Sequence, residues 1–274
     1  LFDTGSIRAV DLFERDYKKI TPEETAQYQA IRASKQERIG DITFTSCTIF
    51  DYPKAVRHHL QLFPNNYLDV TELDEKQLLQ VKLNGFATLL DSDPQKLNER
   101  AVLEFIRQQR AYFIVGSILK DNYQFGHHGA FLFPEFELGT SYKVDYLLVG
   151  NGSGGWEFVF VEFELPKTGS TLKDGDLGEA FRKGLRQIEA WDAWLDSHFG
   201  SMREVFDKAK KPGVPLPSEF VNLDKSRMHF VVVAGRRADF VEKTYRLRRK
   251  NEVLILHYDN LVDFARSIIG KHSY

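Results

Sequence analysis

The sequence has little of what secreted and membrane proteins carry. Only one of its 274 residues is a cysteine, Cys47, so no disulfide can form within the chain, and a reducing cytoplasm is the compartment we expect. No apolar run reaches the roughly 18 residues of a membrane-spanning helix. The formal net charge is only -2, so nucleic-acid binding would depend on local basic patches rather than on an overall positive field. These absences predict a cytoplasmic protein that does not enter a membrane.

What the chain does have is the composition of a folded globular protein. Apolar residues make up 42% and charged residues 28% of it, which is enough apolar material for a sizeable core. The length suggests one or two domains, and we place a boundary after residue 92. Residues 1–92 predict a smaller α+β region, with a helix from Thr21 to about Arg38, a strand within Asp41–Phe50 and a helix containing Leu78–Phe86.

Residues 93–274 alternate between helical and strand patterns. The expected elements, in chain order, are one helix or two tandem helices over 98–119, strands at 130–136, 142–149 and 156–165, a long helix over 177–199, a strand at 228–234, a helix over 238–250, a strand at 252–257 and a helix over 259–269. Strands interspersed with helices in this way predict an α/β domain, in which helices flank a mixed sheet.

Two of these strands form a hairpin that carries acidic residues. Asn151–Gly155 is a strong turn signal, and placing Gly150 opposite Glu157 also places Asp145 opposite Glu162. Directly opposed residues on one face have Cβ atoms about 4.5–5.5 Å apart, and like charges in such a pair are destabilising. The register therefore predicts two carboxylates that repel each other.

A third carboxylate, Glu164, shares the face of Glu162 because side chains alternate along a strand. Two unit charges about 4 Å apart repel by about 4 kcal/mol at an effective dielectric of 20, so the cluster needs a cation, a shared proton or ample solvent. Phe158 and Phe160 lie on the same face, which is therefore not simply wet. A divalent ion is the most economical solution, and carboxylate oxygens favour magnesium or manganese over zinc.

A simpler interpretation of the hairpin stays open. Glu162 and Glu164 would then lie on a solvated strand face, and Asp145 would pair with Lys143 or an arginine.

Five segments, in order, resemble the signature of the Shedu anti-phage defence nucleases. The resemblance covers roughly residues 95–270 and rests on Phe136–Gly139, Lys143–Leu148, Phe160–Pro166, the Gln-x-x-x-Trp element Gln187–Trp191, and the closing pair Val232–Arg237 with Leu256–Leu261. Each segment alone is a weak signal, whereas five in the same order are fairly specific.

The resemblance implies a restriction-endonuclease-like core of the PD-(D/E)XK superfamily. In that superfamily Asp145 and Glu162 would hold the Mg²⁺ or Mn²⁺ ion. Glu164 stands where the commonest form has a lysine, so the usual ammonium is missing, and Lys167 is a candidate to replace it. Glu104 would be the accessory acid of the preceding helix, and Gln187 would orient the site or touch a backbone phosphate.

The implied function is metal-dependent endonucleolytic cleavage of phage or plasmid DNA by a homo-oligomer, with residues 1–92 in a regulatory or oligomerisation role. Two alternatives stay open: an inactive nuclease fold that serves as a DNA-binding or regulatory module, and an unrelated metal-binding or structural α/β protein. The basic residues that we expect at DNA are Lys167, Lys183, Arg236, Arg246, Arg248 and Arg249.

Overall fold

The computed structural model describes residues 17–34, 36–39, 42–45, 52–93, 97–167 and 169–274. Of the predicted strand Asp41–Phe50 only Ile42–Thr45 falls within these ranges, where it forms β2. Cys47 lies outside the described residues.

A five-stranded mixed sheet forms the centre of the fold, as predicted, with the strand order β3-β4-β5-β6-β7. The first three strands pair antiparallel, and β6 and β7 continue the sheet in parallel with β5. The strands are β3 (Gly129–Leu138), β4 (Tyr142–Gly152), β5 (Gly155–Phe163), β6 (Met228–Val233) and β7 (Leu254–Leu256).

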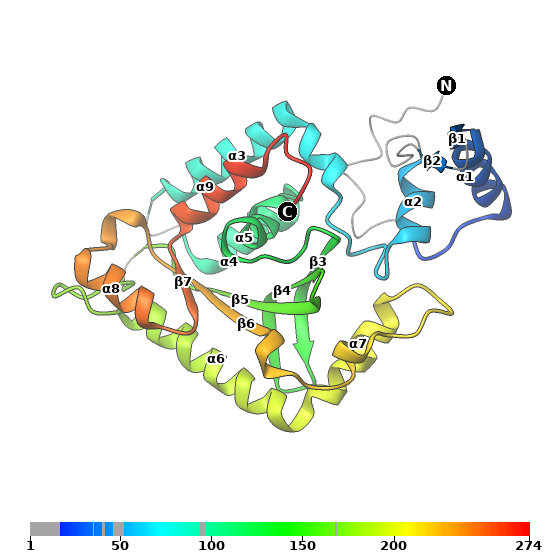
Figure 1. Cartoon of the computed structure of the whole chain (residues 1–274). Coiled ribbons are helices and arrows are strands. Elements are labelled where there is room, and N and C mark those ends of the chain that lie inside the picture. Colours follow the sequence, from blue (N-terminus) through cyan, green and yellow to red (C-terminus); the bar gives the residue numbers. More distant parts are fainter. Residues whose placement is uncertain (1–16, 35, 40–41, 46–51, 94–96, 168) are drawn as a thin grey trace.

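Helices cover both faces of this sheet (Figure 1). On one face lie α3 (Lys76–Leu90), α4 (Glu99–Gln108), α5 (Tyr112–Asn122) and α9 (Tyr258–Ile268), and on the other lie α6 (Glu179–His198) and α7 (Met202–Ala209). The chain is therefore an α/β protein. Burial of apolar side chains between these layers is the main force that holds them together.

Alternation along β5 divides its side chains between two cores. Val159, Val161 and Phe163 pack under the α5 and α9 layer, whereas Phe158 and Phe160 pack against the α6 and α7 layer. These faces are the ones that the alternation of the sequence predicts.

The predicted helix over 98–119 is two helices in tandem. Helix α4 ends at Gln108 and α5 begins at Tyr112, and between them Arg110 adopts a φ of 48°. Such a left-handed residue ends a helix, so the chain turns sharply and both apolar faces reach the core.

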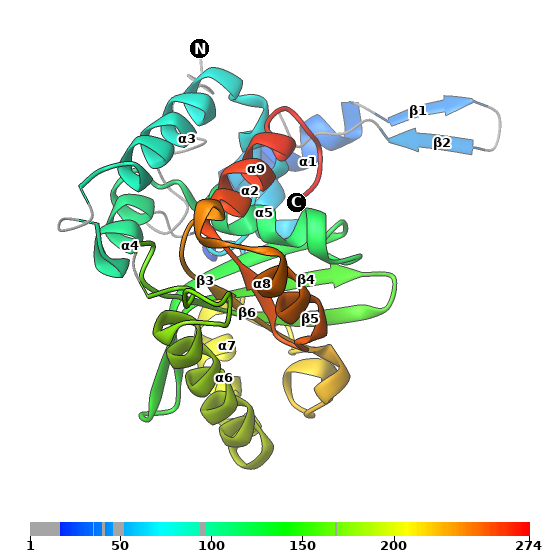
Figure 2. The ribbon, with the colours of Figure 1, turned by 90° about the vertical axis from the view of Figure 1, so that its left-hand side faces the viewer.

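The N-terminal region departs from the prediction where its first helix ends. Helix α1 (Pro22–Ser34) ends before Arg38, and Gln36–Ile39 forms β1, which pairs with β2. Backbone pairing with β2 thus overrides the helical pattern that the sequence shows up to Arg38. Figure 2 shows this hairpin projecting away from the central sheet.

The domain boundary after residue 92 stays a prediction, and several contacts cross it. In the segment after α2 (Pro53–Leu60), the Leu68 N–H donates to the Ala130 carbonyl at 2.8 Å. Gly270 N–H donates to the Leu73 carbonyl at 2.7 Å. In the described part of the chain, no helix combines the length and apolar character needed to cross a membrane.

Candidate active site

The register predicted for the β4–β5 hairpin is confirmed as far as Tyr146, but the ladder ends before the expected pair of Asp145 with Glu162. Gly150 pairs with Glu157, and the ladder continues to Tyr146 opposite Val161. One step further, the Phe163 N–H donates to Asp145 Oδ2 at 2.8 Å. The Asp145 carboxylate is therefore fixed against β5, next to Glu162, by a main-chain hydrogen bond.

The two glutamates at this end of the hairpin are buried rather than solvated, and Asp145 is half-buried. Glu162 is 3% exposed and Glu164 is 1% exposed, which excludes the open alternative of a wet strand face. Lys143 donates to Glu135 at 2.7 Å, so it is not the partner of Asp145, which this alternative paired with Lys143 or an arginine. A buried cluster of acids needs compensation from a proton or a cation.

Burial and mutual repulsion shift the proton affinities of this cluster. Desolvation, with the charges of Glu99 and Glu164, raises the pKa of Asp145 to about 7. Desolvation, followed by the charge of Asp145, raises the pKa of Glu162 to about 10. Glu162 Oε2 is buried and has no hydrogen-bond partner among the described residues. A proton or a cation at Glu162 would therefore relieve an unfavourable arrangement.

Glu164 is held in place by its main chain. Its N–H donates to the Val233 carbonyl at 2.8 Å, and the hydroxyl of Tyr258 donates to its carbonyl at 2.7 Å. These bonds join the end of β5 to β6 and to the start of α9. The position of the Glu164 side chain is thus fixed by three elements of the core.

Lys183 of α6 provides the positive charge that contacts these acids. Its Nζ lies 2.9 Å from each Glu164 carboxylate oxygen and 3.8 Å from Glu99. Burial alone would lower the pKa of Lys183, but the Glu164 hydrogen bond and the neighbouring acids raise it. The positive charge next to Glu164 thus comes from α6 and not from the strand that carries Glu162.

A glycine allows α6 to come this close to the sheet. A Cβ at Gly184 would lie 2.8 Å from Val232 Cγ1 and 3.3 Å from Glu164 Cγ. The absence of a side chain there therefore permits the approach that brings Lys183 to Glu164.

Glu99, which sequence reasoning missed, lies in the first turn of α4, where Asn98 caps the helix by accepting the Ala101 N–H at 2.8 Å. It lines a pocket of about 480 Å³ together with Glu104 and Asp145. A capped helix with an acid in its first turn is visible in the sequence, but which side of the helix faces the hairpin is not.

The other predicted catalytic residues have looser surroundings. Glu104 accepts a hydrogen bond from Gln108 at 3.0 Å and is 44% exposed, but it lines the pocket beside Asp145. Gln187 is half-buried one turn after Lys183, and its side chain makes no hydrogen bond within the described residues. Its amide is therefore available to a substrate.

Lys167 and Arg236 hold other parts of the protein together. Lys167 donates to the Ser92 carbonyl at 2.6 Å. Arg236 donates to Asp259 and to Asp91, the latter at 3.0 Å, and also to the Leu90 carbonyl. Both residues tie the end of α3 to the edge of the site. Arg236 has few donors left for a phosphate, whereas Lys167 makes one hydrogen bond with its three N–H groups.

The remaining basic candidates lie on α8 (Glu242–Lys250). Arg246 pairs with Glu242 one turn away at 2.5 Å, and Arg249 is exposed. Arg248 is half-buried, with a long contact of 3.4 Å to Asn260. Arg249 is thus the best placed of the three for a solvent-side contact.

Asp145 and Glu162 are the acids best suited to hold a divalent ion. Among the described residues, no three Asp, Glu, His or Cys side chains are arranged to hold a metal ion together. Two protein carboxylates with water and substrate oxygens are a normal coordination for Mg²⁺. The unpartnered Glu162 oxygen and the raised pKa values fit such an ion, which would replace the protons.

Comparison with known proteins identifies the family. No curated protein matches the chain. One family model, described as the C-terminal part of the Shedu protein SduA, matches residues 96–262, which span the hairpin, Lys183 and Tyr258. Because this match covers more than half of the 274 residues, the chain belongs to the Shedu SduA family.

Proposed function

We propose that the chain is a metal-dependent DNA endonuclease of a Shedu-type anti-phage defence system, with a PD-(D/E)XK core and a homo-oligomeric assembly. The observation that carries the proposal is the carboxylate cluster of the half-buried Asp145 with the buried Glu162 and Glu164, which has an ammonium 2.9 Å from Glu164. Three acids that repel one another stabilise neither an apolar core nor a solvated sheet face, so their arrangement indicates a functional site.

The metal ion would be held by Asp145 and Glu162. When bound, it supplies Lewis-acid stabilisation of a phosphate oxygen and lowers the pKa of a water molecule. The Phe163 N–H fixes one Asp145 oxygen and leaves the other to ligate. This division of labour keeps the carboxylate oriented while one oxygen exchanges partners.

Glu164 and Lys183 act as a pair in this proposal. Glu164 accepts the proton of the attacking water, and Lys183 holds the carboxylate in position and offers its charge to the phosphate. Lys183 is 53% exposed, so its ammonium can reach a substrate while it stays in contact with Glu164. It takes the place that we first assigned to Lys167.

The experiment is cleavage of supercoiled and linear DNA by the purified protein in Mg²⁺ or Mn²⁺. Asp145→Ala and Glu162→Gln should abolish cleavage without unfolding the protein, whereas Glu137→Gln, at an exposed position of β3, should cleave normally. Cleavage retained by Glu162→Gln would refute the assignment. DNA retardation without cleavage by the unaltered protein would favour the inactive DNA-binding alternative.

A further inference from the structure

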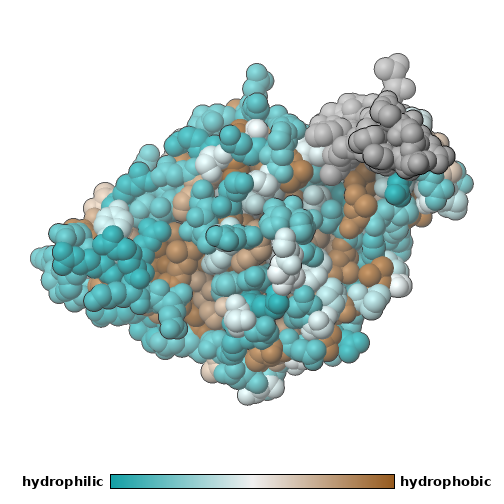
Figure 3. Space-filling model, viewed as in Figure 1, coloured by the Kyte–Doolittle hydropathy of each residue, from teal (hydrophilic) through white to brown (hydrophobic). Residues whose placement is uncertain are grey.

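A second large hollow lies away from the carboxylate cluster, where β6 and β7 begin. It measures about 990 Å³ and is bounded by α6, the end of α5 and the segment that joins α8 to β7. In Figure 3 a hydrophobic patch faces the viewer between α6 and α8, over these strands. Soluble proteins rarely expose a large continuous apolar patch, so a patch of this kind within a hollow indicates a binding surface.

The floor of this groove is apolar and partly exposed. Leu185, Phe230 and Leu254 line it and are only half-buried. The Phe230 ring stacks on the buried Phe160, with ring centroids 5.4 Å apart. The floor is therefore rigid, and its open side has no cover within the described residues.

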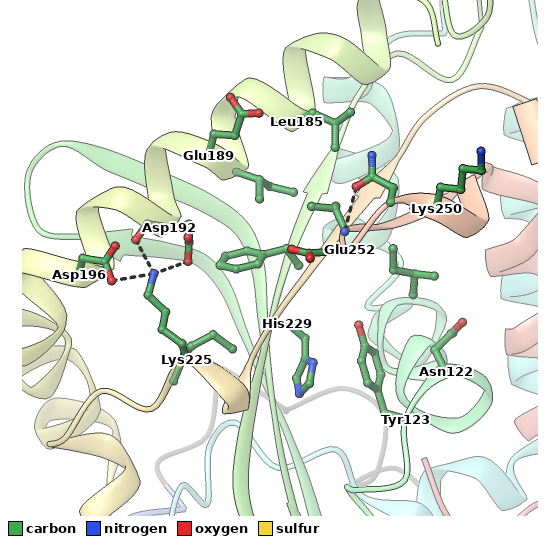
Figure 4. Close-up of a pocket in the computed structure, with 16 residues that line it drawn as sticks. Asn122, Tyr123, Leu185, Glu189, Asp192, Asp196, Lys225, His229, Lys250 and Glu252 are labelled. Carbon is green, nitrogen blue, oxygen red and sulfur yellow. Dashed lines mark hydrogen bonds and ion pairs between the residues drawn. The ribbon is translucent and has the colours of Figure 1, made fainter. Parts of the chain in front are cut away.

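The rim of the groove carries four acids and two lysines, Lys225 and Lys250, so it is acidic on balance (Figure 4). Asp192 and Asp196 share Lys225, whose Nζ lies 2.5 and 2.9 Å from their carboxylates. Glu189 and Glu252 line the same groove and make no ion pair within the described residues. A rim of this charge repels a nucleic-acid backbone and attracts basic side chains.

One edge of the sheet is open at this point. Strand β6 pairs with β5 along its whole length, from Met228 to Val233, but β7 pairs only with Val231–Val233. The first half of β6 therefore has an unpaired side next to the groove, where an extended chain can add as a further strand.

We propose that this groove binds an extended peptide segment of another protein, apolar at its centre and basic at its flanks. The segment adds to the free half-edge of β6, its central side chain packs on Phe230 and Leu185, and its Lys or Arg residues pair with Glu189 and Glu252. This inference does not depend on the proposed nuclease activity, because only binding is at issue.

The test is selection of linear peptides from a random display library on the whole purified protein, with counter-selection on the support without protein, and the selected peptides are then measured on the double variant Glu189→Lys/Glu252→Lys. Enriched peptides should combine an aliphatic or aromatic residue with flanking Lys or Arg. Measured by fluorescence anisotropy, their affinity should fall about tenfold or more in the double variant. The matched control Glu137→Lys/Glu204→Lys, also at two exposed acids, should bind within about twofold of the unaltered protein.

A second measurement keeps the proposal testable if the double variant folds poorly. On addition of a selected peptide to the unaltered protein, the amides of Met228–Phe230 should become protected from hydrogen exchange. Failure to enrich such peptides, equal binding by the double variant, or protection confined to another surface would overturn the proposal. Loss of self-association in the double variant, measured by sedimentation, would also overturn it, because a second copy would then occupy the groove.

Discussion

Replacing Glu162 with glutamine should stabilise the metal-free protein. Burial raises the pKa of Glu162 to about 10, from an ordinary value of 4.5, so the folded protein binds a proton that the unfolded chain has lost at pH 7. At pH 7, about 2.5 units above the ordinary pKa, this difference in proton binding lowers the free energy of unfolding by about 3 kcal/mol, at about 1.36 kcal/mol per unit. Glutamine does not ionise and avoids this cost, but burying its amide without a hydrogen-bond partner destabilises the variant by about 1 kcal/mol.

The expected gain is therefore about 1–2 kcal/mol at pH 7, or about 2–8 °C in Tm. A carboxyl whose folded pKa is raised loses stability as the pH rises above its unfolded value. The advantage of Glu162→Gln should accordingly be small near pH 5 and should grow towards pH 8. Asp145, whose pKa burial raises to about 7, also makes both proteins less stable as the pH rises. Because this contribution is common to both, it does not change the difference between them.

Thermal unfolding in a chelator, at a series of pH values, measures this difference. Glu137→Gln is the matched control, because the same change at an exposed strand position should leave Tm unaltered. Added Mn²⁺ should raise the Tm of the unaltered protein and not that of Glu162→Gln. A variant less stable than the unaltered protein at pH 8 would refute the reasoning, as would an advantage that does not grow with pH.

Three further substitutions test neighbouring parts of the account. Lys183→Ala should lower cleavage about 100-fold while Lys183→Arg and the exposed Lys173→Ala retain most of it, measured as initial rates on plasmid DNA. Tyr258→Phe should cost about 1 kcal/mol in a urea titration, because the Glu164 carbonyl loses a buried donor, and Tyr245→Phe should cost less. Arg57→Ala should cost about 3–5 kcal/mol in the same titration, because it leaves the buried Asp69 and the half-buried Glu72 without their cation, whereas the exposed Arg203→Ala should cost little.

The hairpin could be predicted from the sequence because its determinants are local. The glycine-rich turn fixes Gly150 opposite Glu157, and strict alternation then decides which residues share a face. The burial of Glu162 and Glu164 also follows from Phe158 and Phe160 on that face. A one-residue slip would have reversed every face, so the confirmed register places Glu162 and Glu164, whereas Asp145 lies beyond the last ladder pair and is held by the Phe163 N–H.

The rest depends on contacts between distant segments. Lys183 was expected at DNA, and only the close approach of α6 at Gly184 brings it to Glu164. Glu99 lies on α4, and the direction of α4 relative to α5 depends on the turn at Arg110. No sequence pattern predicts the left-handed conformation of Arg110. Arg236 was predicted to contact a phosphate. It pairs instead with two acids that lie 23 and 145 residues away in the chain, and the sequence gives no sign of this pairing.

The central claim is that Asp145 and Glu162 exchange protons for a divalent ion. Calorimetric titration with Mn²⁺ at pH 7, in buffers of different ionisation enthalpy, counts the protons released on binding. We predict release of about 1.5 protons per ion bound, because at pH 7 Glu162 is protonated and Asp145 is about half protonated, with binding lost in Glu162→Gln. Absence of binding, or binding of equal strength in that variant, would contradict the claim.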